Sequence, residues 1–595
     1  MLEDPDIFWG KIAQELTWYK PWDKVLEWNY PYARWFVGGQ CNIVANALDR
    51  HMQNETASKT ALIWEGQDGS ERTFTYRQLN EEVCRFANAL KSLGVQKGDR
   101  ITIYLPRMPE QFIAMLACAK IGAIHSVVFS GFSAEALKNR IEDAKSEILI
   151  TANAYPYGKK LIETKKNVDE AIAESSLIKK VVVVKRLDKE TAMKEDRDIW
   201  WDELMSKQSA TCETEIMDAN DPLFVLYTSG TTGEPKGILH AHGGYMVGIY
   251  STLKSVFDLQ ADDIYYCTAD VGWITGHSYI VYAPLINGAT TFVYEGTPDY
   301  PDPGKWWQLV EKYKITKFYT APTAIRALEK YGEDYPKKYN LSSLKILGSV
   351  GEPINPEAWL WYHKNIGGGR CPIMDTWWQT ETGMFMISPL PSSKLKPGSV
   401  YKPLPGIDAD VVDEAGKPVE ANKKGFLVIK KPWPAMFLDI YQDSDRYKQT
   451  YFEKIPGVYF TGDSAKKDED GYIWIIGRND DVIKVSGHRL GSAELETAID
   501  SHPAVVEAAV IGKPHEVKGE SIKAFVILKI GNQPSDQLKK ELIEQVRKMI
   551  GPIATPDEID FVDKLPKTRS GKIMRRVLKA QELGQALGDI STLEN

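Results

Sequence analysis

Short apolar runs alternate with helix-like segments along residues 60–380, and turn residues bound each run. This arrangement is typical of buried strands that are joined by crossover helices. The expected strands are RITIYLP, EILIT, KKVVVVKR, LFVLYT, TTFVYEG, KFYTAP and LKILGSVGEP. The pattern therefore predicts an α/β fold with parallel sheets. Because ligands bind beyond the carboxyl ends of such strands, we expect the site in the loops that follow them.

The pattern changes twice in the last third of the chain. From Tyr401 to Arg478, the segments GIDADVVDEAGKPV, GFLVIKK and DGYIWIIGR indicate hairpins or a small β-barrel. Beyond them, a helix (SAELETAIDSH) and two strands (VVEAAVIGK and IKAFVILKI) predict a separate α+β domain. We place the boundary near Asp480, which gives an N-terminal domain over 1–479 and a C-terminal domain over 480–595.

The C-terminal domain is expected to contain a second helix, beginning at Ser535. Its predicted buried face has four apolar residues at helical spacing: Leu538, Leu542, Val546 and Met549. The strand EIDFVDKLP and a basic helix near Lys572 to Lys579 are expected to follow.

Charge and cysteine content narrow the function classes. The 595 residues carry a formal charge of -8, which argues against general binding to nucleic acids or to anionic membranes. The six cysteines are scattered without a C-x-x-C pair, so reduced thiols are expected. His240 and His242 have no cysteine or carboxylate at ligand spacing, and a metal site there is the less favoured alternative. With no signal peptide or membrane span in the pattern, we expect a cytoplasmic protein.

A glycine-rich loop at Tyr227 to Gly237, YTSGTTGEPKG, follows one expected strand. Compared with a Walker A loop it has Lys236 in the lysine position, but Pro235 replaces the second glycine and Gly237 replaces the hydroxyl residue. That hydroxyl is the one that contacts Mg²⁺ in Walker A proteins. The loop therefore predicts a phosphate site of another kind, with a Walker-type ATPase as the disfavoured alternative.

Four further segments have compositions suited to nucleotide chemistry, although each is weak alone. They are DTWWQTETG (375–383), YFTGD (459–463), GRNDDVIKVSGHRLG (477–491) and LPKTRSGKIMRR (565–576). Together and in this order, they resemble the adenylate-forming superfamily of acyl-CoA synthetases, luciferases and peptide-synthetase adenylation domains. Within it, stretches such as WFVGGQCNIVANALDRH, TADVGWITGHSY and GSVGEPINPEAW resemble the AMP-forming acetyl-CoA synthetases.

The resemblance implies an adenylate-forming enzyme fold and a two-step reaction. A carboxylate would attack the α-phosphorus of ATP, releasing pyrophosphate, and the thiol of CoA would then displace AMP. Neither step needs a protein nucleophile, because positioning and charge stabilisation are sufficient. The C-terminal domain would act as a mobile lid about a hinge at Asp480, with Lys572 serving the first step and Ser486 and Gly487 the second.

The resemblance also assigns the nucleotide site. Catalytic roles are implied for Lys572, Lys236, Arg489 and Glu381, with Glu381 as the Mg²⁺ ligand. The residues implied to bind ATP or AMP are Thr228, Ser229, Gly230, Thr231, Thr232, Gly233, Gly351, Glu352, Pro353, Asp375, Thr376, Trp377, Gln379, Thr380, Asp463, Arg478 and Arg489.

The acid and the thiol are assigned in the same way. The implied acyl pocket consists of Ile274, Thr275, Val350 and Trp378, with the indole as its floor, which predicts acetate with slower propionate. The implied CoA contacts are Gly131, Lys159, Lys160, Ala321, Ser486, Gly487 and Arg547.

Three positions depart from the family pattern. Ile274 is bulkier than the usual valine, and Met384 follows TETG where a second glycine is common. The segment YPYGKKL (155–161) lacks the usual arginines for CoA. Lys159, Lys160 or Arg547 could take their place, although a lysine supplies only a point charge.

Several alternatives stay open. The acid could be propionate or a short hydroxy or unsaturated acid, and the reaction could run in reverse to make ATP. An inactive scaffold is disfavoured, since Lys236, Glu381, Asp463, Arg489 and Lys572 are all present. A lysine acetyltransferase and deacetylase acting on Lys572 are candidate partners, and the oligomeric state is left open.

Overall fold

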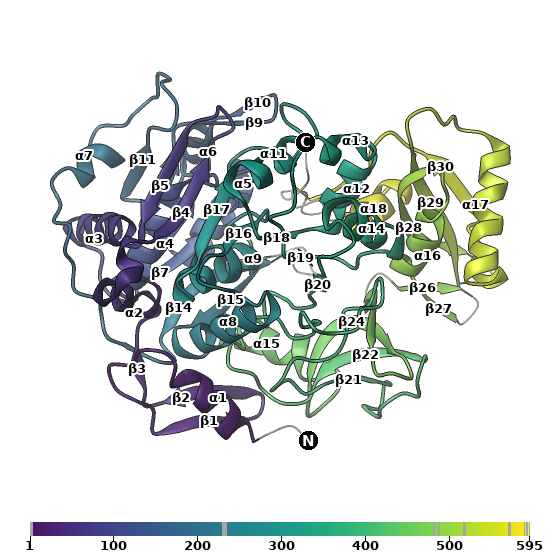
Figure 1. The fold of residues 1–595 in the computed structure, drawn as a ribbon, viewed down its shortest axis with the longest axis horizontal. Helices are drawn as coiled ribbons and strands as arrows, with labels where there is room; N and C mark the ends of the chain where they lie inside the picture. The colour runs from purple at the N-terminus through teal and green to yellow at the C-terminus, as the bar shows by residue number, and fades with distance from the viewer. Residues whose placement is uncertain are drawn as a thin grey trace.

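The computed structural model has two α/β sheets, a smaller antiparallel sheet and a C-terminal domain at one end of the long axis (Figure 1). It describes residues 4–228, 235–479, 482–485, 488–515, 519–568, 573–587, 590 and 593, and only the backbone at 482, 484, 488, 489 and 494. Among these residues, no helix combines the length and the apolar character needed to cross a membrane. All six cysteines are free thiols.

The first sheet has eight strands and ends in an antiparallel pair next to the glycine-rich loop. In spatial order its strands are β12 (Asp198–Trp200), β11 (Lys180–Val184), β8 (Ile148–Ala152), β6 (Arg100–Tyr104), β7 (Ile124–Val127), β14 (Pro222–Thr228), β15 (Lys236–Ala241) and β23 (Asp439–Ile440).

The second sheet has seven strands, and its parallel part carries the GEP and TETG segments at its carboxyl ends. In spatial order its strands are β20 (Ile373–Asp375), β19 (Ile346–Ser349), β18 (Lys317–Thr320), β16 (Ile264–Cys267), β17 (Thr290–Tyr294), β4 (Thr60–Glu65) and β5 (Glu71–Thr75).

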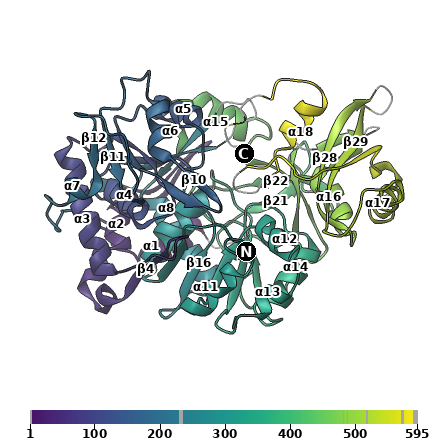
Figure 2. The same ribbon diagram turned by 90° about the horizontal axis from the view of Figure 1, so that it is seen from above.

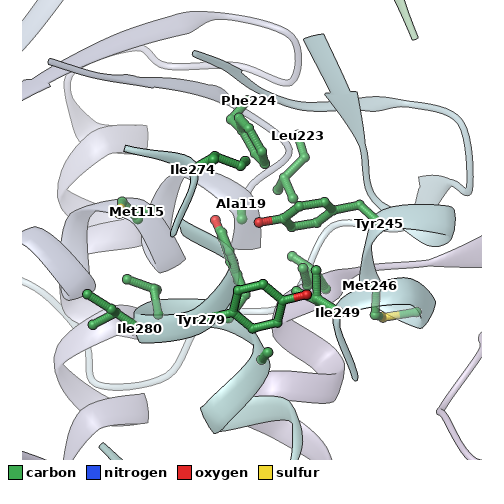
Figure 3. Packing of buried hydrophobic residues seen from close by; sticks show 14 of the residues in the cluster. Met115, Ala119, Leu223, Phe224, Tyr245, Met246, Ile249, Ile274, Tyr279 and Ile280 are labelled. Atoms are coloured by element: carbon green, nitrogen blue, oxygen red, sulfur yellow. The ribbon is translucent and has the colours of Figure 1, made fainter. Parts of the chain in front are cut away.

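Helices cover the faces of these sheets (Figures 1 and 2). The α-helices of the N-terminal part are α1 (Pro5–Ala13), α2 (Ile43–Ala47), α3 (Tyr76–Ser92), α4 (Pro109–Lys120), α5 (Ala134–Ala144), α6 (Thr164–Ala171), α7 (Trp201–Met205), α8 (Gly243–Val256), α9 (Ile274–Gly276), α10 (Ala283–Ile286), α11 (Lys305–Tyr313), α12 (Pro322–Glu329), α13 (Asp334–Lys337), α14 (Pro356–Trp361) and α15 (Ser444–Tyr451). A large apolar core lies between them, and Figure 3 shows Ile274 and Tyr279 within it.

The remaining N-terminal strands form small sheets. Two-stranded pairs are β1 (Lys24–Asn29) with β2 (Tyr32–Val37), β3 (Gln40–Cys41) with β13 (Met217–Asp218), and β9 (Tyr155–Tyr157) with β10 (Lys160–Ile162). The expected small β-barrel region is an open four-stranded antiparallel sheet of β21 (Ala409–Val412), β22 (Lys424–Ile429), β24 (Tyr459–Lys467) and β25 (Ile473–Arg478).

The C-terminal domain is α+β, as the sequence predicted. Its sheet contains β27 (His488–Gly491), β26 (Val482–Val485), β29 (Gly519–Leu528), β28 (Val505–His515) and β30 (Glu558–Phe561). Its helices are α16 (Ser492–Asp500), α17 (Asp536–Met549) and α18 (Arg575–Glu582).

One prediction about α17 is wrong. Leu538, Leu542 and Val546 are buried, but Met549 is 52% exposed. It lies at the last helical position, and its sulfur accepts a hydrogen bond from Ser501 Oγ at 3.2 Å. Helical spacing identified the buried face of the helix but not that its last residue on that face is exposed.

Candidate active site

The second sheet aligns the carboxyl ends of three strands in one row. Thr320 pairs with Ser349 across β18 and β19, and Ser349 pairs with Asp375 across β19 and β20. The residues that follow these ends therefore come together at one edge, as parallel strands require. This edge carries the GEP segment and the start of TWWQTETG.

Asp463 is the centre of a hydrogen-bond network at one end of the site. Its Oδ2 accepts hydrogen bonds from Trp377 Nε1 and Gln379 Nε2, both at 3.0 Å. Arg478 is its cross-strand partner, with Nη1 at 3.5 Å from Oδ1. Gln379 also accepts a hydrogen bond from the Tyr459 hydroxyl at 2.8 Å. The structure thus joins four of the residues assigned to the nucleotide by resemblance.

Lys236 and Glu381 meet at the other end of the site. Strand pairing places Lys236 on β15 opposite Thr228, and its Nζ lies 3.5 Å from Glu381 Oε1. The hydroxyl of Tyr451, from the end of α15, accepts a hydrogen bond from Lys236 Nζ at 2.6 Å and donates one to Glu381. The Thr228 hydroxyl oxygen is buried without a hydrogen-bond partner among the described residues. A lysine, a carboxylate and a hydroxyl therefore surround the ends of the glycine-rich loop.

Burial and mutual attraction set the charges of this group. Burial lowers the pKa of Lys236, although Glu381 partly opposes this. Burial alone would raise the pKa of Glu381, but Lys236 and the Tyr451 hydroxyl outweigh it, so the pKa lies below its usual value. Burial raises the pKa of Tyr451 well above its ordinary value. The carboxylate is therefore ionised near neutrality and the tyrosine keeps its proton.

Three residues assigned to the nucleotide by resemblance, Gly351 to Pro353, lie just beyond the carboxyl end of β19. Gly351 has a φ of 97°, in the left-handed region that favours glycine. The carboxylate of Glu352 accepts hydrogen bonds from Thr323 and, at 2.9 Å, from Arg326 Nη2. Two side chains of helix α12 therefore fix the position of the Glu352 carboxylate.

Asp375 and Thr376 are buried at the adjacent end of β20. Burial raises the pKa of Asp375 well above its usual value. The Thr376 hydroxyl donates to the Ser349 carbonyl at 2.9 Å and also contacts Tyr319 Oη at 2.7 Å. Thr380 contributes its carbonyl oxygen to His240 Nε2 at 2.7 Å, which fixes the segment just before Glu381.

The four residues assigned to the acyl pocket come from three strand ends. Ile274 and Thr275 begin α9 beyond β16, Val350 follows β19 and Trp378 follows β20. Ile274 and Val350 belong to the core, and Trp378 packs against it. The indole lies edge-on to Tyr279 with ring centroids 4.9 Å apart, and its Nε1 is 3.4 Å from Tyr319 Oη.

The residues assigned to CoA lie on several loops and one helix, and Gly131 is beside Ser130, whose hydroxyl lies 2.9 Å from Tyr155 Oη at the start of the β9–β10 hairpin. Gly131 lies in the turn after β7, Ala321 precedes α12, and exposed Lys159 and Lys160 lie at the turn between β9 and β10. Arg547 is exposed on the last turn of α17, which lies at one end of the molecule, whereas the β9–β10 hairpin lies nearer the middle of the long axis (Figures 1 and 2). The assignment of Arg547 to CoA stays a prediction.

Several predicted residues lie outside the described part of the chain. They are Ser229, Gly230, Thr231, Thr232, Gly233, Asp480, Ser486, Gly487, Lys572 and the side chain of Arg489. Their assigned roles stay predictions.

Sequence reasoning missed two tyrosines of the site and one arginine behind it. Tyr451 and Tyr459 stack with ring centroids 5.5 Å apart. Tyr451 follows Tyr447 by four residues in the polar helix SDRYKQTY, a spacing that marks one buried face and could have drawn attention to it. Arg326 has no such local signal, since its partners Glu352 and Glu507 are remote in sequence.

Glu381 has the donor chemistry that suits a magnesium ion. Carboxylate oxygens are the ligands this ion prefers, and the Glu381 side chain keeps 12% of its surface exposed. One oxygen is held by Tyr451, whereas the other makes no hydrogen bond to another described residue. The residues present therefore fit a site in which Glu381 is the protein ligand.

Comparison with known families matches nearly the whole chain. The model of the AMP-binding enzyme family matches residues 48–438, that of its C-terminal domain matches 494–572, and that of the acetyl-coenzyme A synthetase N-terminus matches 1–47. The chain is also similar to a solved structure, the acetoacetyl-CoA synthetase from Streptomyces lividans, with a TM-score of 0.91 and 27% identity over 100% of this chain and 91% of the other.

Curated relatives are similar over the same length. The acetyl-coenzyme A synthetase of Methanothrix thermoacetophila is 55% identical over 99% of this chain and 90% of its own. That of Rubrobacter xylanophilus is 54% identical over 99% of this chain and 92% of its own.

Fold and family matches together define an adenylate-forming enzyme, with a large nucleotide-binding part and a small C-terminal domain. The chain belongs to the AMP-binding enzyme family, in the branch of the acetyl-coenzyme A synthetases.

Proposed function

We propose that the protein activates acetate with ATP to acetyl-AMP and pyrophosphate, and then transfers the acetyl group to CoA with release of AMP. The observation that carries this proposal is the continuous polar row from Lys236 and Glu381 to Gln379 and Asp463. It has a cation and a carboxylate at one end and a hydrogen-bond acceptor for a ribose at the other. Full-length similarity to acetyl-coenzyme A synthetases supports acetate as the acid.

In the first step, an acetate oxygen forms a bond to the α-phosphorus while the bond from that phosphorus to the pyrophosphate oxygen breaks. The developing charge lies on the leaving phosphates, so the enzyme must supply positive charge there. Lys236 provides this charge from β15, and Thr228 provides a hydroxyl. Asp463 and Arg478 hold the ribose side, which fixes the α-phosphorus relative to the acid.

Glu381 is the residue we assign to magnesium. The ion, when bound, would offset phosphate charge and favour departure of pyrophosphate. The protein's own part is to hold the carboxylate in place, through Tyr451 on one oxygen and through the Phe437 amide, which donates to the Glu381 carbonyl at 3.1 Å.

In the second step, the CoA sulfur bonds to the acetyl carbon and AMP leaves with the electron pair. Lys159, Lys160 and Arg547 remain the candidates for the CoA phosphate, together with Gly131 and Ala321.

The test is acid-dependent pyrophosphate exchange into ATP across acetate, propionate, butyrate and short hydroxy acids, followed by a CoA titration. We expect acetate to give the highest kcat/KM and propionate to be lower, since one methylene is worth about 1 to 3 kcal/mol. Exchange with no short acid would refute the proposal, whereas a different preferred acid would keep the chemistry and change the substrate.

Lys572 is expected to act only in the first step. Lys572→Ala should abolish acetate-dependent pyrophosphate exchange, because the charge that bridges acid and α-phosphate is lost, and should spare thioester formation from supplied acetyl-AMP. Lys567→Ala is the control, since this lysine pairs with Glu507. Equal loss of both half-reactions in Lys572→Ala would contradict the assigned role.

A further inference from the structure

The Tyr451 hydroxyl lies between two opposite charges in the candidate site. It accepts a hydrogen bond from Lys236 Nζ at 2.6 Å and donates one to Glu381 Oε1. The two charged atoms are 3.5 Å apart. A buried pair can be closer, as in the 2.9 Å between Lys165 Nζ and Asp198 Oδ2, whose side chains are 3% and 0% exposed. The hydroxyl therefore acts as a spacer within the ion pair.

Ring packing fixes the position of this hydroxyl. The Tyr451 ring stacks on Tyr459 at 5.5 Å and meets Phe437 edge-on at 5.1 Å. Tyr459 is itself held by its hydrogen bond to Gln379. The Lys236 ammonium lies 4.9 Å from the centre of the Tyr451 ring. The hydroxyl is thus placed by an aromatic stack that does not depend on the two charges.

We propose that Tyr451 is a positioning residue that holds the ion pair of Lys236 and Glu381 at 3.5 Å, so that it does not close to a shorter contact, and so keeps Lys236 available to nucleotide phosphates. This role rests on the proposed function, in which ATP is the ligand. Both charged side chains are only 12% exposed. Opposite charges attract strongly in such a place, and a closed pair would neutralise the lysine before ATP arrives.

Tyr451→Phe removes only the spacer. The phenyl ring keeps the stack on Tyr459, so the helix and the pocket wall remain. Without the hydroxyl, Lys236 can move to within direct hydrogen-bond distance of Glu381 and must leave it again to meet a phosphate. ATP binding then carries the cost of breaking a buried ion pair.

The experiment measures the dissociation constant for ATP by calorimetry in EDTA, without any divalent cation. We expect Tyr451→Phe to weaken binding by about tenfold, or about 1.4 kcal/mol. Adding Glu381→Gln to this variant removes the anion that captures Lys236, so the double variant should regain most of the lost affinity. Because Glu381→Gln alone also removes a charge that repels the phosphates, the recovery counts only where Glu381→Gln improves the affinity more in Tyr451→Phe than in the wild type. A purely structural role for the tyrosine predicts equal improvements.

Tyr447→Phe is the matched control. Tyr447 lies one turn earlier on α15, and its hydroxyl donates to the Pro31 carbonyl at 3.2 Å, away from the site. The affinity of Tyr447→Phe for ATP should equal that of the wild type. Unchanged affinity in Tyr451→Phe, or no recovery in the double variant, overturns the proposal while the wild type still binds ATP. A wild-type protein that does not bind ATP would refute the proposed function as well.

Discussion

Trp378 is the single residue with the greatest expected influence on which acid is used. Its indole is packed edge-on against Tyr279 and against Phe385, with ring centroids 4.9 Å and 5.5 Å apart. Tyr319 meets its Nε1. A ring fixed on three sides cannot turn aside for a longer chain, so the space it leaves is set by its own size.

We expect Trp378→Gly to extend the range of acids. Loss of the indole opens the floor of the pocket, so kcat/KM for butyrate or longer acids should rise at least about tenfold relative to acetate. Pyrophosphate exchange across a chain-length series measures this. Trp378→Phe should give an intermediate profile, and ATP affinity should be unchanged in both. An unaltered chain-length preference would show that the indole is not the floor.

At the scale of elements, strands could be predicted more fully than the contacts between them. Each apolar run expected to be a strand from RITIYLP to LKILGSVGEP forms one. The carboxyl end of the last one is followed by Val350, as parallel-sheet logic requires, whereas Thr376 follows β20, which was not among the expected strands. Tyr451 and Arg326 could not be predicted, because their roles depend on where a helix packs. The spacing of apolar residues predicts which face of a helix is buried, but not which element packs against that face.

Buried histidines that resist protonation lie beside the site. They are on β15, at the start of α8 and in the π-helical segment His277–Tyr282. Burial lowers the pKa of His240 and of His277 to about 4, and that of His242 at the start of α8 to about 3. One ring nitrogen of each has no hydrogen-bond partner among the described residues. These imidazoles are therefore neutral in the folded protein near pH 7, whereas in the unfolded chain they have a pKa of about 6.5.

Acid should therefore destabilise the fold through these elements. A folded-state pKa below the unfolded value gives stability that is present above about pH 6.5 and is lost as pH falls. For His242, the loss between pH 7 and pH 5 is about 2 kcal/mol. Urea unfolding at pH 7 and at pH 5 gives the free energy of unfolding, and its decrease between the two pH values should be smaller in His242→Asn than in the wild type by about this amount. His363→Asn, a less buried histidine, is the control, and identical drops in His242→Asn and the wild type would contradict the assignment.

At the scale of the whole molecule, a buried ionic cluster joins the two domains. Arg326 on α12 donates to Glu352 of the nucleotide side at 2.9 Å and to Glu507 of β28 at 3.3 Å. Glu507 also pairs with Lys567, which precedes the predicted Lys572 segment. Burial alone would lower the pKa of Arg326, but Glu352, Glu507 and Asp500 together raise it. Arg326 thus pairs with carboxylates of both domains.

Removal of Arg326 should loosen the attachment of the C-terminal domain. Arg326 and Asp500 line an open pocket of about 180 Å³ whose walls come from both domains. Arg326→Met leaves Glu352 without its cation, and breaking such a buried pair costs about 3 to 5 kcal/mol. Hydrogen exchange should therefore accelerate in α12 and in the facing end of β28, while the first sheet keeps its protection.

A second measurement tests the same cluster. The added change Glu507→Gln should cost less stability in Arg326→Met than in the wild type, since the partner is already absent. Arg370→Met is the control, because among the described residues Arg370 bonds only to the N-terminal part, namely to the carbonyls of Leu341 and Leu344 and to Cys371. Uniform acceleration across both domains, or equal costs of Glu507→Gln in the two backgrounds, would show that the cluster does not hold the domains together.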